Sequence, residues 1–416
     1  MYPSYLASLA NLKESQRNIL IVSRVFLPDP GGIQEYVYNR CLQDRDQVIV
    51  LSAACPESAS FDQIQPFPIH RWSGGWVGHI KGVGGFLKQM LYMFWEVFWG
   101  IALFFRYRYR AIEWAHGYDF PAILVLSYLL PIRFSLYLHG DDVLCPLKNK
   151  VFAMLFEWTL RRAAAIACNS TFTCEVLKSH FRFDTPIHII YPTVRPEKFG
   201  NAADSNRGQA FRAQVRNKFG ISESSIVILS VGRLVRRKGF DRILDQMPRL
   251  LAAGIDVYYI ICGTGPLESE LRTQAHRLDV DARTIFAGYV PDDELACFYW
   301  ACDIFALATF FEPKARSIEG FGIVYLEAGL FSKPVVASRS GGVEDAVKDA
   351  ETGILVDPNA TDAIFDALFQ LANDPQLRHE LGRNGCLHAR SQPSFQVLYQ
   401  NSPASFSASS HGIIGP

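Results

Sequence analysis

The sequence predicts an α/β protein made of two domains, each a doubly wound and mostly parallel sheet, that face each other across a cleft. Three observations lead to this prediction. The chain has 416 residues, which is more than one hydrophobic core of ordinary size uses. Short apolar runs typical of buried strands alternate with helix-like segments along most of its length. A polar stretch rich in Pro and Gly, residues 192–208, divides these runs into two sets.

The first set of runs predicts an N-terminal domain over residues 18–191. It begins with the apolar run Asn18–Ser23, and a loop containing Gly31 and Gly32 follows before a helix expected at Gln34–Leu42. The further expected strands are Gln47–Ala53, Ile69–Trp72, Ala111–Gly117, Phe134–Gly140, Ala164–Ser170 and Ile187–Tyr191. Because strands alternate with helices, we expect a parallel sheet whose ligands bind beyond the carboxyl ends of the strands.

The second set predicts a C-terminal domain over residues 209–390. Its expected strands are Ile226–Val231, Val257–Cys262, Thr284–Ala287, Ile304–Ala308, Pro334–Ser338 and Gly353–Asp357. Residues 192–208 are expected to link the domains, and the Ser-, Pro- and Ala-rich residues 391–416 to form a poorly ordered tail. The cleft between the domains is then the expected ligand site.

Composition argues against several classes of protein. The chain has 41 basic and 41 acidic residues, and this balance argues against nucleic acid as the main partner. Its nine cysteines include no C-x-x-C pair, and Cys168 and Cys262 lie in apolar runs, so we expect buried thiols in a reducing compartment. No cluster of His, Cys and acidic residues has metal-ligand spacing, so no metal or cofactor is expected. The N-terminus lacks the pattern of a signal peptide, which predicts a cytoplasmic location.

One stretch of the N-terminal domain leaves two interpretations open. Phe86–Phe105 is apolar, rich in aromatic residues and long enough to span a bilayer, but Lys88 and Glu96 interrupt it, so a spanning helix is not expected. It is either a buried core helix or a helix that rests on the inner face of an anionic membrane, with the basic run Arg106–Arg110 beside it. An enzyme with a lipid acceptor would need such a membrane contact.

The strongest signal for a ligand site is the stretch from Glu319 to Glu327. Gly320, Phe321 and Gly322 follow the first carboxylate, and the apolar run after the second glycine predicts a helix that begins there. A helix N-terminus attracts phosphate groups. Glu319 would lie before the helix and Glu327 inside it, so that they could hold two different sugars of one ligand. The alternative is two solvated glutamates beside a core helix.

Two cations are expected at a strand end of the same domain. The first strand of the C-terminal domain runs into Gly232 and Arg233, and Lys238 follows five residues after the arginine. A guanidinium that can form two parallel hydrogen bonds and a nearby ammonium group, both directed at the same position, suit a diphosphate. The alternative is a solvated basic turn, which is the expected state of Arg236 and Arg237.

Other strand ends supply further candidates. Gly263 and Gly265 resemble a dinucleotide fingerprint without its third glycine, and they favour a nucleotide base or ribose nearby. The main chain of Val290, in the turn after the next strand, could contact the base. In the N-terminal domain, His139 ends a strand, and His116 ends another where an acceptor pocket could form. A lone His is more often structural, and as a general base it needs an orienting partner.

In this order the motifs resemble those of the retaining glycosyltransferases of family 4, which have the GT-B fold of two Rossmann-like domains. The resemblance covers about residues 18–390 and is more specific in the second domain. It rests on Gly31-Gly32, His139-Gly140, Cys168-Asn-Ser170, Gly232-Arg233, Lys238-Gly239, Gly263-x-Gly265, Gly288-Tyr-Val-Pro291, Glu319-x7-Glu327, Ser340-Gly-Gly342 and Glu351-Thr-Gly353. The wording around Glu319 is most similar to that of the phosphatidylinositol mannosyltransferase-like enzymes, whose donor is GDP-mannose.

The resemblance implies a metal-independent hexosyltransferase that retains the anomeric configuration. Its donor would be a nucleotide-diphosphate sugar, GDP-mannose or UDP-hexose, and its acceptor a lipid or an oligosaccharide. The implied catalytic residues are His139, Arg233, Lys238 and Glu319. The implied donor-binding residues are Gly31, Gly32, Gly232, Gly263, Gly265, Val290, Gly320, Phe321, Gly322 and Glu327. In this scheme Arg233 and Lys238 hold the diphosphate, Glu327 holds the ribose hydroxyls, and Glu319 contacts the transferred sugar.

Two other classes stay open at this point. One is an isomerase or hydrolase of the same fold that acts on a nucleotide sugar alone, and the other is a non-catalytic nucleotide-sugar binding protein. The chain also departs from the family near the hinge, where Asn-Gly-Val-Asp is common and this sequence has Pro192-Thr-Val-Arg195. This departure leaves the details of the hinge and of the acceptor open.

Overall fold

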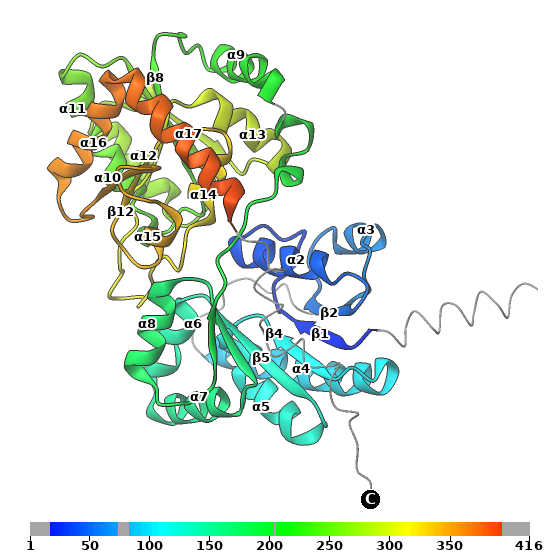
Figure 1. The fold of residues 1–416 in the computed structure, drawn as a ribbon. Helices are drawn as coiled ribbons and strands as arrows, with labels where there is room; N and C mark the ends of the chain where they lie inside the picture. Colours follow the sequence, from blue (N-terminus) through cyan, green and yellow to red (C-terminus); the bar gives the residue numbers. More distant parts are fainter. Residues whose placement is uncertain (1–16, 74–82, 204, 393–416) are drawn as a thin grey trace, which may run out of the picture. The chain divides into compact units, whose positions relative to one another are not determined.

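The computed structural model describes residues 17–73, 83–203 and 205–392, and it divides into two compact units (Figure 1). The first unit contains the described residues up to Tyr191, and the second runs from Pro192 to Gln392. Most of the predicted tail, residues 393–416, lies outside the described residues, as do residues 1–16.

The first unit is built on a seven-stranded parallel sheet with the strand order β3-β2-β1-β4-β5-β6-β7. The strands are β1 (Ile19–Val22), β2 (Val48–Ala53), β3 (Ile69–Trp72), β4 (Ala111–Trp114), β5 (Arg133–Leu138), β6 (Ala165–Cys168) and β7 (Ile187–Ile189). Each lies in or overlaps a predicted run, although several end earlier because the run continues into a loop. The order reverses between β1 and β4, where an open α/β sheet binds its ligands.

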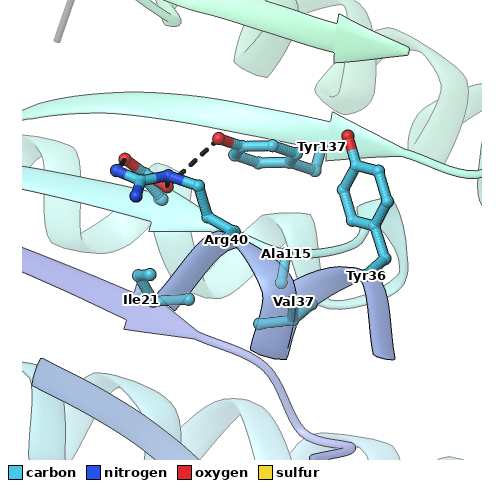
Figure 2. Close-up of a pocket in the computed structure, with 7 residues that line it drawn as sticks. Ile21, Tyr36, Val37, Arg40, Ala115 and Tyr137 are labelled. Atoms are coloured by element: carbon cyan, nitrogen blue, oxygen red, sulfur yellow. Dashed lines mark hydrogen bonds and ion pairs between the residues drawn. The ribbon is translucent and has the colours of Figure 1, made fainter. Parts of the chain in front are cut away.

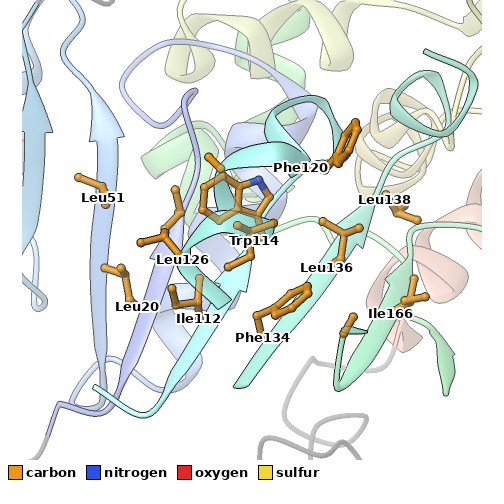
Figure 3. Close-up of a cluster of buried hydrophobic side chains, with 14 of the residues drawn as sticks. Leu20, Leu51, Ile112, Trp114, Phe120, Leu126, Phe134, Leu136, Leu138 and Ile166 are labelled. Carbon is orange, nitrogen blue, oxygen red and sulfur yellow. The ribbon is translucent and has the colours of Figure 1, made fainter. Parts of the chain in front are cut away.

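Helices cover both faces of this sheet. Helix α2 (Gly32–Gln43) packs Tyr36 and Val37 on one face, while α4 (Val83–Tyr107), α5 (Phe120–Leu129) and α7 (Lys150–Arg162) pack on the other. Figure 3 shows this second core, in which Leu20 and Trp114 from the strands gather with Leu126 from α5. Because side chains alternate along a strand, neighbouring residues of β1 belong to opposite cores. The remaining α-helices of the unit are α3 (Ser58–Gln63), α6 (Asp141–Leu144) and α8 (Thr171–His180).

A buried ion pair ties α2 to the sheet. Nε and Nη2 of Arg40 donate to the two carboxylate oxygens of Glu113 on β4, at 2.9 and 2.8 Å. The Tyr137 hydroxyl on β5 donates to the same carboxylate at 3.1 Å, and both charged side chains are only 2% exposed. Figure 2 shows these groups beside a small cavity. The pair therefore fixes the position of the helix whose first residue is Gly32.

Helix α4 is buried on one face and exposed on another, so neither a buried core helix nor a membrane-contacting helix describes all of it. Tyr92, Leu103 and Tyr107 belong to the core, whereas Phe94 and Phe98 are exposed. The interpretation as a buried core helix therefore holds for only one face of α4. Among the helices that the structure describes, none combines the length and the apolar composition needed to cross a membrane.

The second unit contains a six-stranded parallel sheet with the order β10-β9-β8-β11-β12-β13. Its strands are β8 (Ile226–Val231), β9 (Val257–Cys262), β10 (Thr284–Gly288), β11 (Ile304–Leu307), β12 (Val335–Ser338) and β13 (Gly353–Val356). Its helices are α9 (Gly208–Lys218), α10 (Phe240–Leu244), α11 (Met247–Ala252), α12 (Glu268–Arg277), α13 (Asp292–Ala301), α14 (Ile323–Leu330), α15 (Val343–Ala346), α16 (Thr361–Asn373) and α17 (Pro375–Ser391). The strand order reverses between β8 and β11, so the loops after these two strands flank the expected ligand position.

Part of the stretch predicted as a linker is packed against the second unit. Residues Pro196–Ala203 form the 3-10 segment η3, and the Phe199 side chain is completely buried. Its ring contacts the rings of Tyr299 and Phe331, with centroid separations of 6.0 and 5.0 Å. Because Phe199 is buried in this way, the main chain at the preceding residue, Lys198, has a defined position.

The prediction of buried thiols is confirmed for Cys168 and Cys262, which are buried in strands β6 and β9, but not for every cysteine. Cys55, Cys145, Cys297 and Cys386 are only partly buried.

Candidate functional site

Glu319 and Glu327 flank the start of α14, as predicted. Gly322 is the N-cap residue with φ of 89°, a conformation that favours glycine, so the chain turns into the helix at this residue. The Gly342 N–H donates to the Glu319 carbonyl oxygen at 3.0 Å, and a Cβ on Gly341 would overlap that oxygen. The turn formed by these two glycines therefore fixes the main chain of the first glutamate.

Two cations hold the Glu319 side chain. The Lys238 Nζ lies 2.6 Å and the Arg237 Nη1 lies 2.7 Å from its Oε2, and all three side chains are largely buried. Gly239 makes this approach possible, because it has φ of 70° and a Cβ there would overlap the Ala308 carbonyl oxygen. The loop after β8 thus lies against the loop after β11, the two loops that flank the reversal of strand order.

Ionisation of this cluster follows from its charges. Burial by itself raises the pKa of Glu319, but Lys238 and Arg237 outweigh burial and lower it to about 2. Burial also lowers the pKa of Lys238, against the opposing effect of Glu319. Two cations beside one carboxylate leave an excess of positive charge, which suits an anionic ligand such as a diphosphate.

This ion cluster should make the second unit sensitive to acid. The folded-state pKa of Glu319, about 2, lies below its ordinary value of 4.5, so its stabilisation is present above about pH 4.5 and is lost as the pH falls toward 2. A shift of this size corresponds to about 3 kcal/mol of unfolding free energy. Amide hydrogen exchange of β8 and β11 at a series of pH values measures the effect. The variant Glu319→Gln should show a flatter pH dependence, and an unchanged slope would contradict the assignment.

The prediction that Arg237 is a solvated residue of a basic turn is wrong. It donates to Glu319, whereas Arg236 lies in solvent and pairs with the exposed Glu270 at 2.8 Å. The two arginines are neighbours in sequence, and only the direction of each side chain from the 3-10 turn at Arg236–Lys238 separates their roles.

Arg233 lies in the same loop and is exposed. Its charge lies near enough to Lys238 to contribute to the lowered pKa of that lysine. The two cations predicted to act together are therefore close in space.

The glycines after β8 and β9 have a packing role. A Cβ on Gly263 would overlap the carbonyl oxygen of Gly232, and a Cβ on Gly265 would lie 2.5 Å from the Leu234 carbonyl oxygen. These glycines let the two loops lie against each other at the carboxyl edge of the sheet. Val290 is buried in the turn between β10 and α13, next along that edge.

Glu327 is held by two residues that sequence reasoning missed. The Lys198 Nζ lies 2.8 Å from its Oε1, and the Tyr299 hydroxyl donates to its Oε2 at 2.8 Å. The glutamate is only 1% exposed. Nothing in the sequence pointed to Lys198, because its polar surroundings placed it in the predicted linker.

In the first unit, His139 follows β5 and is held from three sides. Its main-chain N–H donates to Asp142 at 2.8 Å, its Nε2 lies 2.8 Å from the Ala115 carbonyl oxygen, and its ring meets Tyr36 edge to face. Since a carbonyl only accepts, Nε2 carries the hydrogen and Nδ1 is an acceptor. Burial lowers the pKa of His139, so the ring is neutral near pH 7. Asp142, which sequence reasoning did not single out, also accepts the Gly117 N–H at 2.8 Å and so joins two strand-end loops.

His116 has a structural place. It is buried, and its Nε2 accepts the main-chain N–H of Arg24 at 3.2 Å. Burial lowers its pKa, so it is neutral, and beside it burial raises the pKa of Asp119. His116 therefore connects the loops after β1 and β4.

Helix α2 begins at Gly32, so the predicted Gly31-Gly32 turn also lies at a helix N-terminus near the end of β1.

No group of three or more His, Cys, Asp or Glu side chains within residues 17–73, 83–203 and 205–392 could hold a metal ion.

Two family models match the chain. Residues 30–198 match the model described as Glycosyltransferase Family 4, and residues 211–387 match the model described as Glycosyl transferases group 1. The two models cover most of the first and second units, respectively.

Several curated relatives are mannosyltransferases. The chain is 27% identical over 398 residues to the GDP-mannose-dependent monoacylated alpha-(1-6)-phosphatidylinositol monomannoside mannosyltransferase of Corynebacterium glutamicum, a match that covers 92% of this chain and 96% of the relative. It is also 33% identical over 250 residues to the GDP-mannose-dependent alpha-(1-6)-phosphatidylinositol monomannoside mannosyltransferase of Mycobacterium tuberculosis. This match covers 59% of this chain and 62% of the relative.

Solved structures show the same fold. HepE of Anabaena, solved with UDP and glucose, matches with a TM-score of 0.74 at 19% identity over 94% of this chain and all of HepE. Sucrose-phosphate synthase of Thermosynechococcus elongatus also matches with a TM-score of 0.74 at 19% identity, over 92% of this chain and 96% of that one. The two parallel sheets and these neighbours confirm the GT-B fold. The chain is therefore a glycosyltransferase of the GT-B fold, and it is similar in sequence to the phosphatidylinositol mannosyltransferases.

Proposed function

We propose that the protein transfers mannose from GDP-mannose to a lipid-borne acceptor with retention of the anomeric configuration. The observation that carries the proposal is the cluster of Lys238 and Arg237 around Glu319, next to the start of α14. The choice of donor and of lipid acceptor rests on the relatives, which are named as GDP-mannose-dependent enzymes acting on phosphatidylinositol monomannoside.

The cluster supports this chemistry through its charges. When the bond between the sugar and the diphosphate breaks, negative charge grows on the leaving phosphate and positive charge grows on the sugar ring. In the proposal, Arg233 and Lys238 stabilise the phosphate, and Glu319 contacts the transferred sugar. Arg237 keeps this carboxylate ionised while Lys238 binds phosphate. Because these cations and the helix start supply the positive charge, the proposal needs no bound metal.

Retention of the anomeric configuration determines the face of the sugar at which the acceptor reacts. The acceptor hydroxyl attacks the anomeric carbon from the face that the diphosphate leaves, and its proton passes to the departing phosphate oxygen. One carbon–oxygen bond forms and one breaks. His139 is proposed to contact the sugar at the reacting face, where its neutral ring can accept a hydrogen bond through Nδ1.

A donor panel tests this proposal. The protein is incubated with GDP-mannose, GDP-glucose or UDP-glucose, with and without vesicles that contain phosphatidylinositol monomannoside. Release of GDP that depends on the lipid, with an α-linked mannosyl product by NMR, is the expected result. Release of GDP without acceptor would favour a hydrolase, and conversion of the donor without release of GDP would favour an isomerase. Binding without turnover would favour a non-catalytic binding protein.

We also propose that a surface of the first unit contacts an anionic membrane. Helices α4, α5 and α7 pack in sequence along one face of the sheet, and large apolar side chains on all three are exposed. These are Met90, Leu91, Phe94, Phe98 and Phe105 on α4, Val125, Tyr128 and Leu129 on α5, and Val151, Phe152, Met154 and Trp158 on α7. Helix α5 contains no charged residue although it lies at the surface. Large apolar side chains exposed on neighbouring helices favour an interaction site on this face.

The charges beside this patch favour anionic lipid. Lys150, Arg161 and Arg162 on α7 are exposed, whereas Glu157 on the same helix is paired with Arg161 at 2.5 Å. Arg162 stacks over the ring of Tyr128 at 3.9 Å. Aromatic rings with basic neighbours are typical of proteins that rest in the interfacial region of a bilayer.

Replacing Phe94 and Phe98 by serine should weaken vesicle binding by about 10- to 100-fold, because full burial of such a ring is worth roughly 1.5 to 3 kcal/mol and about half of each ring is exposed. Co-sedimentation with vesicles of phosphatidylcholine and phosphatidylglycerol measures this effect. Leu387→Ser removes an equally exposed apolar side chain from α17 and should change nothing. If the unaltered protein stays in the supernatant, the membrane contact is wrong.

A further inference from the structure

Lys198 bridges two carboxylates in the second unit. Its Nζ lies 2.8 Å from Oε1 of Glu327 on α14 and 3.4 Å from Oδ1 of Asp292, the first residue of α13. The lysine side chain is 12% exposed and that of Glu327 is 2% exposed, so the closer pair is largely withdrawn from water. An ion pair at such a place constrains the carboxylate strongly.

The position of Lys198 is set by its neighbour. Phe199 is completely buried against Tyr299 and Phe331, whose own rings are stacked at 5.2 Å. Tyr299 belongs to α13, and its hydroxyl donates to the second oxygen of Glu327. One aromatic cluster therefore places both donors that hold this carboxylate.

The resulting hydrogen-bond pattern suits a vicinal diol. An ionised carboxylate offers about four lone-pair sites, two on each oxygen. Lys198 takes a site on Oε1 and Tyr299 takes a site on Oε2, so that each oxygen keeps one further site. Burial, followed by the charge of Glu327, raises the pKa of Tyr299 well above its ordinary value, and the phenol remains a donor. Each oxygen can thus accept one more hydrogen bond beside the donor that it already has.

We propose that Lys198 is a positioning residue of the donor site, which holds Glu327 so that its two oxygens accept hydrogen bonds from the 2′- and 3′-hydroxyls of the donor ribose. The inference rests on the proposed function, which gives Glu327 its ribose contact. Through Asp292, the same lysine links the carboxylate to the start of α13, directly after the turn that contains Val290. One cation therefore contacts both the proposed ribose-binding carboxylate and the first residue of the helix that follows the proposed base-binding turn.

The test compares the dissociation constants of GDP and 2′,3′-dideoxy-GDP, measured by calorimetry. The unaltered protein should prefer GDP by about tenfold or more, as expected for two hydrogen bonds to a charged group. Lys198→Met should lose most of this preference while binding dideoxy-GDP within about twofold of the unaltered protein, and Lys198→Arg should restore part of it. Lys218→Met removes the same charge from an exposed position on α9 and should keep the full preference.

The outcomes separate the inference from the proposed function. If Lys198→Met keeps the preference for GDP, or binds GDP more tightly, the lysine does not position the carboxylate and the inference is overturned. Lys198→Gln gives a second variant with a shorter polar side chain if the methionine variant does not fold. If instead Glu327→Gln keeps the preference, the ribose contact itself is wrong, and with it that part of the proposed function.

Discussion

Lys238→Ala is expected to slow sugar transfer by about 100- to 1000-fold, the usual effect of removing one preorganised charge from the site of a developing anion. Lys238 lies 2.6 Å from Glu319, and the loop that carries it is held against the end of β11 at Gly239. The protein should remain folded, because Arg237 still pairs with the buried carboxylate at 2.7 Å. Initial rates of mannosyl transfer at saturating acceptor measure the change in kcat.

Arg236→Ala is the matched control for this variant. It removes a cation from the same three-residue turn, but Arg236 pairs with Glu270 in solvent, where such pairs contribute little. Its rate should stay within about twofold of the unaltered protein. Equal losses in the two variants would mean that only the net charge of the turn matters, and a normal rate for Lys238→Ala would refute the site.

Arg40→Met is expected to destabilise the first unit by about 3 to 5 kcal/mol, the usual cost of removing one partner of a buried ion pair. Glu113, which is 2% exposed, would keep the Tyr137 hydroxyl at 3.1 Å but lose two charge-assisted hydrogen bonds from the guanidinium. Because Arg40 lies on α2, the loss should reach the Gly31-Gly32 turn at the start of that helix. Amide hydrogen exchange in β1 and β4 reports the unfolding free energy of this unit.

Two further variants decide whether the buried charge causes this loss. Adding Glu113→Leu to Arg40→Met should recover much of the stability, since a buried pair replaced by apolar groups is often neutral. Arg161→Met breaks an exposed pair with Glu157 on α7 and should cost less than about 1 kcal/mol. A similar cost for the exposed and the buried pair would contradict the argument.

The strands could be predicted from the sequence because strands of a parallel sheet, covered on both faces, are continuous apolar runs. Ile226–Val231 and Val257–Cys262 agree with β8 and β9 at both ends. The start of α14 could be predicted for a different reason, since only glycine adopts the φ of 89° at Gly322 without strain. Such local requirements are visible in the residue types themselves.

Partners at long sequence distance could not be predicted in this way. Arg236 and Arg237 have the same chemistry and adjacent positions, yet one lies in solvent and the other holds a carboxylate 82 residues away. Lys198 is a similar case, because its composition indicated a linker while its amine contacts a glutamate 129 residues further on.

By itself, the sequence determined the two sheets, the glycine turns and the residue types that carry charge at the strand ends, because these depend on periodicity and on local backbone conformation. The tertiary structure alone decided which charges meet. It paired Arg237 and Lys238 with Glu319, and Lys198 and Tyr299 with Glu327, because the direction of a side chain and the neighbours it meets are set by how the loops pack against one another.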